Sequence, residues 1–135
     1  MAQLAFVHLT NTLITAGILG VMYAFLSATV IRSRAKNRVS LGHGGHAELE
    51  ARIRAHGNFA EYVPFVLILM GLVELAGGNR TVLMWSGIAL VALRVLQAIG
   101  VWARVAPHPL RIAGTAGTLT LLVGYSAWAI AIGYR

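Results

Sequence analysis

Four polar side chains recur along one face of a segment that is otherwise largely apolar. At about 100° per residue they fall within roughly a quarter turn of each other on a helix, in the order Glu50, Arg54, Asn58 and Glu61. Guanidinium groups bind carboxylates through paired hydrogen bonds, and a carboxylate can receive an ammonium group. This polar face therefore predicts a site for a small zwitterionic peptide with additional carboxylates.

The depth of the polar face in a membrane makes it unusual. From Val63 to Ala76 there are only 14 residues, about 21 Å of helix, whereas the hydrocarbon is about 30 Å thick. A span that ends at Ala76 must reach back to Gly57, which places Asn58 and Glu61 at hydrocarbon depth. A charge there costs a few kcal/mol unless it is paired or faces a wet cavity. We interpret the face as a functional site, with a network that only holds helices together as the alternative.

The third apolar segment offers a partner for this face. Arg94 lies about 20 Å along a helix from Thr81. Glu61 lies about 22 Å along the preceding helix from Ala76. Because consecutive spans are antiparallel, the two depths match, and we predict a Glu61–Arg94 ion pair. Gln97 lies one turn beyond Arg94.

Four long apolar segments must position these groups, at residues 4–31, 50–76, 81–102 and 112–134. Each meets or exceeds the roughly 20 residues that a helix needs to cross a membrane. The 135-residue chain is 58% hydrophobic and 11% charged, whereas soluble domains are about a quarter charged. We predict an all-α membrane protein whose single domain is a bundle of four transmembrane helices.

Lysine and arginine are distributed unevenly along this bundle. The connections after the first span and before the fourth hold six of them: Arg32, Arg34, Lys36, Arg38, Arg104 and Arg111. The opposite side has only Arg80 and Arg135. The positive-inside rule predicts that both termini lie outside the cytoplasm. The net charge of +7 then orients the chain in the membrane, and we expect no nucleic-acid partner.

The small residues and the histidines of the sequence are expected to have structural roles. The first span has a small residue every fourth position, and the fourth span opens with several more: Ala16, Gly20, Ala24, Ala28, Gly114, Thr115, Ala116, Gly117 and Thr118. Small residues allow helices to approach closely, so both spans are expected to pack tightly. His56 points away from the polar face and is expected to form an inter-helix hydrogen bond. His43 and His46 lack a third ligand nearby, so no metal site is expected.

The stretch from Glu50 to Pro64 reads Glu-x-x-x-Arg-Ala-His-x-Asn-x-x-Glu-Tyr-x-Pro and resembles the signature of the MAPEG family. These are the membrane-associated proteins in eicosanoid and glutathione metabolism. The similarity extends to the chain length, the four spans, the basic first loop, an Arg inside the third span and an Arg that opens the fourth. Within the family the chain looks most like the small bacterial branch, which implies a bacterial inner membrane.

The resemblance implies a homotrimer of four-helix protomers that binds glutathione between adjacent protomers at the cytoplasmic end. By position in the motifs, the glutathione-binding residues are Arg54, Asn58, Glu61, Arg94 and, at the start of the signature, Glu50. Arg111 matches the Arg that lies near the glutathione sulfur in the eicosanoid-forming members, so it is the expected catalytic residue. The implied activity is that of a glutathione transferase or peroxidase acting on lipophilic small molecules from the bilayer.

Two positions depart from the family's pattern. Several members have a Tyr about two turns after the span-three Arg, where this chain has Val101-Trp102. A basic residue often follows the first Glu of the signature, where this chain has Ala51. A non-enzymatic trimer whose polar network serves assembly or ligand binding is therefore the alternative. A transporter is a further one, although four short-looped helices lack the broken, repeated helices of transporters.

Overall fold

The computed structural model describes residues 8–103 and 108–134. Within these ranges the chain forms four helices, α1 (Thr10–Asn37), α2 (Ala47–Leu75), α3 (Arg80–Trp102) and α4 (Pro109–Gly133), and no strand. Each helix is long and apolar enough to cross a membrane. The predicted all-α fold with four membrane-spanning helices is confirmed.

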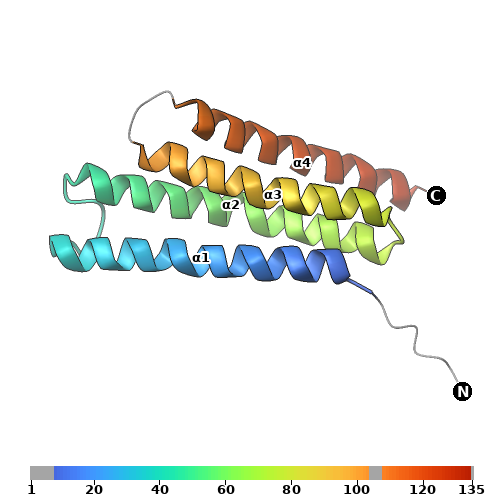
Figure 1. Cartoon of the computed structure of the whole chain (residues 1–135), viewed down its shortest axis with the longest axis horizontal. Helices are drawn as coiled ribbons and strands as arrows, with labels where there is room; N and C mark the ends of the chain where they lie inside the picture. Colours follow the sequence, from blue (N-terminus) through green and yellow to red (C-terminus); the bar gives the residue numbers. More distant parts are fainter. Residues whose placement is uncertain (1–7, 104–107, 135) are drawn as a thin grey trace, which may run out of the picture.

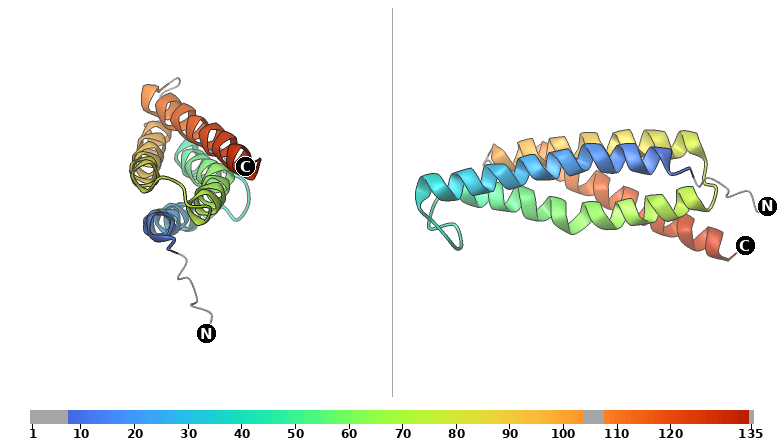
Figure 2. Two further views of the ribbon diagram at one scale, coloured as in Figure 1. Left: turned by 90° about the vertical axis from the view of Figure 1, so that its right-hand side faces the viewer. Right: turned by 90° about the horizontal axis from the view of Figure 1, so that it is seen from below.

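The helices run alternately in opposite directions within one bundle (Figure 1). α2 and α3 each contact all the other helices, whereas α1 and α4 make no contact with each other and lie on different sides of the bundle (Figure 2). α1 ends and α2 begins at the same end of the bundle at which α3 ends and α4 begins (Figure 1). We call this the basic end, because the last two turns of α1 and the residue after them carry Arg32, Arg34, Lys36 and Arg38 there.

The first helix differs from the predicted span 4–31, whose first residues lie outside the described ranges. α1 begins at Thr10 and continues to Asn37, because nothing after residue 31 breaks a helix and basic side chains favour a helix C-terminus. Hydropathy marks the edge of the hydrocarbon rather than the end of the helix. Arg38, the residue that follows α1, caps the helix with a left-handed φ of 54°. The N–H of Val39 then donates to the carbonyl oxygen of Arg34 at 3.1 Å, a common way to close a helix.

The other helix ends follow from local sequence. The side-chain oxygen of Asn79 accepts hydrogen bonds from the N–H groups of Thr81 and Val82, so it caps the start of α3. Pro109 occupies the first turn of α4, where its missing N–H costs nothing. α2 remains one helix from Ala47 to Leu75 although it contains Pro64.

The surface is far more apolar than that of a soluble protein, and the mostly apolar interior also holds several polar groups. Large apolar side chains cover the outside, and Val21, for example, is 74% exposed. The interior includes polar groups, and its largest fully buried side chain is Arg94. Soluble proteins rarely expose apolar surface on this scale, so this exterior is suited to contact with lipid chains.

Candidate functional site

A pocket of about 290 Å³ lies near the basic end and is formed by α2, α3 and α4. We call it the polar pocket, and its lining consists of Ile53, Arg54, Gly57, Asn58, Glu61, Gln97, Val101 and Arg111. Four of the residues predicted to form the site line it, namely Arg54, Asn58, Glu61 and Arg111. The fold thus brings an arginine of α4 to the polar face of α2.

The helical period explains which residues of α2 enter the pocket. Arg54, Asn58 and Glu61 are spaced four and three residues apart, so they lie on one side of the helix. Arg54 and Glu61 are exposed, whereas Asn58 is half-buried. Charged groups therefore lie toward the opening, and an amide lies between them.

Arg94 lies behind the polar pocket and is not part of its lining. Its side chain is 0% exposed. Nη1 donates to Oδ1 of Asn58 at 2.8 Å, and Nη2 donates to the carbonyl oxygen of Gly114 at 2.7 Å. Within the part of the chain that the structure describes, Nε has no partner. Arg94 therefore joins α3 to both α2 and α4 and orients the Asn58 side chain that lines the pocket.

The predicted Glu61–Arg94 ion pair is wrong. Among the described residues, the ion pair that forms is Arg52–Glu48, at 2.8 Å on the surface of α2. Helix rise gives the depth of a residue but not the direction in which its side chain points. Arg94 points into the bundle toward neutral acceptors, whereas Glu61 is an exposed side chain of the pocket lining.

Arg111 reaches the pocket because α4 packs directly on α3. A Cβ atom at Gly100 would collide with the backbone N of Arg111, and one at Gly114 would collide with the backbone and Cβ of Gln97. A Cβ atom at Gly117 would likewise meet the side chain of Leu93. The tight packing predicted for the start of the fourth span is confirmed at Gly114 and Gly117, and Gly100 is a positioning residue that the sequence did not single out.

The first span does not show the expected tight packing within the protomer. A Cβ atom at Gly20 would meet no other atom within 4 Å, and Ala24 is exposed. α1 instead crosses α3 at Thr15, whose Oγ1 would collide with a Cβ atom at Gly87. The small residues of α1 thus leave an open face in the single chain.

Three residues in and near the pocket complete the description of the site. Glu50, which was predicted to bind glutathione, is exposed and does not belong to the pocket lining. Val101 lies in the lining and is, with Trp102, one of the two positions at which the sequence departs from the Tyr that the resemblance implies. Gln97 is also part of the lining. Its position on α3, one turn after Arg94, is the sequence feature that could have identified it as a site residue.

Histidines lie away from the polar pocket. Nε2 of His56 is 3.0 Å from Oγ of Ser27, and the ring of Tyr23 stacks on the His56 ring with centroids 4.8 Å apart. The expected inter-helix hydrogen bond of His56 is thereby confirmed, and it joins α2 to α1. Nδ1 of His43 accepts from the N–H of Gly45 at 3.2 Å, and the described residues contain no group of three potential metal ligands. Arg104, one of the six basic residues used to predict the orientation, lies outside the described ranges.

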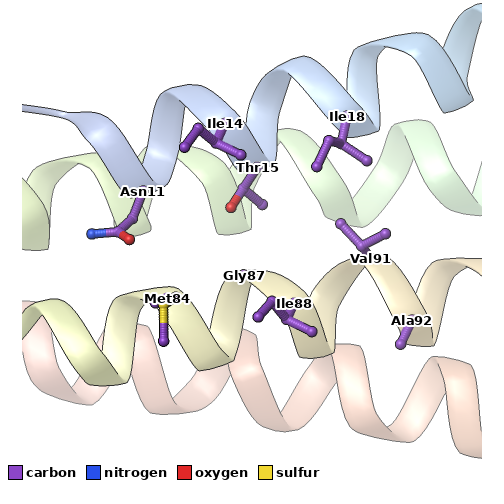
Figure 3. A pocket seen from close by; sticks show the side chains of 9 residues that line it. All are labelled: Asn11, Ile14, Thr15, Ile18, Met84, Gly87, Ile88, Val91 and Ala92. Carbon is purple, nitrogen blue, oxygen red and sulfur yellow. The ribbon is translucent and has the colours of Figure 1, made fainter.

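The far end of the bundle contains a polar contact and an apolar groove. The carboxylate of Glu74 accepts hydrogen bonds from the N–H groups of Asn11 and Thr12 at 2.9 and 2.8 Å, so the end of α2 caps the start of α1. The groove, about 470 Å³ between α1 and α3 (Figure 3), is lined by Asn11, Ile14, Thr15, Ile18, Met84, Gly87, Ile88, Val91 and Ala92. None of these side chains is ionisable, so the groove offers no general acid or base of the usual kinds.

Comparisons with known proteins agree with this architecture. Residues 12–131 match the sequence model of the MAPEG family. The inner membrane protein YecN of Escherichia coli K12 is 38% identical over 87 residues, which cover 58% of this chain and 66% of that protein. YecN of Escherichia coli O6:H1 matches with the same values, so the match spans slightly less than two thirds of these relatives. No solved structure matches the chain.

Proposed function

Since the chain belongs to the MAPEG family and is a multi-pass inner membrane protein, we propose that it binds glutathione in the polar pocket and acts as a glutathione transferase or peroxidase. The second substrate is a lipophilic electrophile that enters from the bilayer. One observation carries this proposal, the convergence of Arg54, Glu61 and Arg111 on one pocket.

Charge complementarity supports glutathione as the ligand. The pocket lining holds two guanidinium groups, of Arg54 and Arg111, and one carboxylate, of Glu61. Glutathione carries the complementary set, which is two carboxylates and one ammonium. Arginine forks bind carboxylates through paired charged hydrogen bonds, and these are strong at a depth where water is scarce. Asn58, held by Arg94, adds an amide between the charges.

The environment of Arg111 favours a thiolate. Arg111 lies in the first turn of α4, where the helix N-terminus adds a partial positive charge. Positive charge near a thiol lowers its pKa, and the proton leaves to solvent. In the transferase reaction, the thiolate sulfur forms a bond to an electrophilic carbon, and a leaving group departs with its electron pair. In the peroxidase reaction, two glutathione thiols are oxidised to glutathione disulfide, and their two electrons and two protons reduce the O–O bond of a hydroperoxide to give an alcohol and water.

Assembly and orientation are part of the same proposal. We propose a homotrimer that binds glutathione between adjacent protomers, with the basic end in the cytoplasm. The polar pocket, about 290 Å³, is at the lower limit of ligand pockets, which span roughly 300–1,000 Å³. Its charged side chains are exposed in the single chain, so a neighbouring protomer that covers them would enlarge and close the site.

A second candidate function is ligand binding or assembly without catalysis. The observation that favours it is Val101, which lies in the pocket lining and is, with Trp102, one of the two positions at which the sequence departs from the Tyr that the resemblance implies. No hydroxyl group belongs to the lining, so the sulfur would depend on Arg111 and the start of α4. This candidate predicts glutathione binding without a thiolate, or a polar network that serves assembly alone.

Two measurements on the detergent-purified protein separate these functions. Isothermal titration calorimetry with glutathione measures binding, and ultraviolet difference absorbance measures thiolate formation. Binding with a thiolate signal supports the enzyme, and binding without one supports the second candidate. Arg54→Gln is expected to weaken binding roughly tenfold or more, whereas Arg52→Gln is the matched control, because Arg52 is outside the pocket lining. Absence of binding by the wild type would overturn the glutathione proposal.

A further inference from the structure

Gln97 is a polar residue of the pocket that neither the motif nor the charges account for. It lies in the lining and is 3% exposed. In residues 8–103 and 108–134, no hydrogen-bond partner for its side chain is found. The amide nitrogen and oxygen of Gln97 are not among the buried polar atoms without a partner in these residues, so they reach the space of the pocket, where a ligand can donate to the oxygen and accept from the nitrogen.

The surroundings of Gln97 restrict where this partner can lie. Its Cβ packs at the closest approach of α3 and α4, where a Cβ atom at Gly114 would collide with it. The guanidinium of Arg94 is already bound to Asn58 and to the carbonyl of Gly114. Val101, one turn further along α3, offers no polar group. The polar pocket is therefore the remaining direction for the carboxamide.

The chemistry of the lining identifies the kind of group that Gln97 binds. Arg54, Glu61 and Arg111 account for the charged groups of glutathione, and what remains is its neutral middle, with two peptide groups. A carboxamide both donates and accepts, so it can donate to a peptide carbonyl and accept from a peptide N–H. We propose that Gln97 is a specificity-determining contact that hydrogen-bonds a peptide group of bound glutathione. This inference rests on the proposed function.

The test replaces Gln97 by a side chain of similar length without a donor. Gln97→Met should bind glutathione roughly ten- to hundredfold more weakly in calorimetry, because a buried peptide group of the ligand loses its partner. The matched control is Val95→Met, which introduces the same side chain on the same helix at an exposed position outside the lining and should keep the wild-type affinity. Without ligand, Gln97→Met should melt no lower than the wild type, whereas a purely structural role for Gln97 predicts a lower melting temperature.

An analogue of glutathione in which 2-aminobutyrate replaces cysteine identifies the contacted group. It keeps both peptide groups and lacks the thiol, so the Gln97→Met loss should have the same factor as for glutathione. A loss that disappears with this analogue would place Gln97 at the sulfur and overturn the assignment. Wild-type affinity in Gln97→Met would also overturn it while leaving the proposed function intact. No binding by the wild type would overturn both. If Gln97→Met does not fold, Gln97→Glu, which keeps the shape but removes the donor, should show the same loss.

Discussion

Arg94 shows how a buried guanidinium can be held without a carboxylate. Its two terminal nitrogens donate to Asn58 and to the carbonyl of Gly114, and both acceptors are neutral. The residue types around this group could be predicted from the sequence, because a charge at hydrocarbon depth requires partners. The partner itself could not, because Asn58 and Glu61 lie on the same face of α2 and at similar depth. Only the packing of α4, which supplies the Gly114 carbonyl, decides which way Arg94 turns.

A double-mutant cycle distinguishes the observed contact from the predicted ion pair. Arg94→Gln and Asn58→Ala should each reduce the free energy of unfolding. Because both substitutions remove the same hydrogen bond to a charged group, the double mutant should lose less stability than the sum of the two single mutants, with a coupling free energy of about 1–3 kcal/mol. Arg94→Gln and Glu61→Gln should instead be additive. Denaturation of the protein in detergent measures both cycles. Strong coupling of Arg94 with Glu61 and none with Asn58 would contradict the contacts of the structure.

Because Val101 has no hydroxyl group, a substitution that adds one at this position should increase glutathione transferase turnover. Val101→Tyr places a phenol in the polar pocket, where it can donate to a thiolate and lower the pKa of bound glutathione. Turnover with a generic electrophile should rise roughly tenfold, which corresponds to about 1.4 kcal/mol in the barrier. Val101→Phe is the matched control, since it has nearly the same size without the hydroxyl. Equal turnover of the Tyr and Phe variants would show that the missing hydroxyl does not limit the reaction.

At the scale of elements, the helices were predictable from hydropathy, and their contacts were only partly so. Long apolar runs indicate the four helices because a membrane span must be about 20 residues long. The end of α1 was missed, since its charged last turns continue the helix outside the hydrocarbon. The cap that Glu74 provides to α1 was also missed, because it joins residues far apart in the chain. Gly114 and Gly117 belong to a small-residue cluster visible in the sequence, whereas Gly100 is isolated among larger residues.

Two glycines of the last helix pair should respond in opposite ways to the same substitution. Gly100→Ala pushes its methyl group into the backbone of Arg111, so it should reduce the free energy of unfolding by roughly 1–3 kcal/mol and weaken glutathione binding. Gly124→Ala has open space around it, and it should stabilise α4 by up to about 1 kcal/mol. Thermal unfolding and calorimetry measure both effects. If Gly100→Ala changes neither the free energy of unfolding nor glutathione binding, the close packing of α4 on α3 does not position Arg111.

At the scale of the whole molecule, the apolar exterior and the charged pocket suit the two proposed substrates, one from the lipid and one from water. In the proposed reaction, a lipophilic molecule would reach the bundle from the hydrocarbon, and glutathione would enter from water at the basic end. The residues that line the polar pocket lie in the parts of α2, α3 and α4 nearest that end, so the orientation of the bundle in the membrane would decide which compartment supplies the proposed glutathione. Lys and Arg residues are the sequence features that predict this orientation, and they carry no information about where the pocket opens.

The positive-inside rule predicts that the basic end faces the cytoplasm and that the C-terminus lies on the other side. The described residues at the basic end include Arg32, Arg34, Lys36 and Arg38, against Arg80 at the start of α3. A fluorescent reporter that matures only in the cytoplasm should be dark when fused after residue 135. An alkaline phosphatase fused at the same point should be active, because it folds only outside the cytoplasm. Fusions truncated in the α1–α2 connection, after residue 45, are the control and should give the reverse pattern. A bright reporter at the C-terminus together with an active phosphatase at residue 45 would invert the topology, and cytoplasmic glutathione could then not reach the pocket directly.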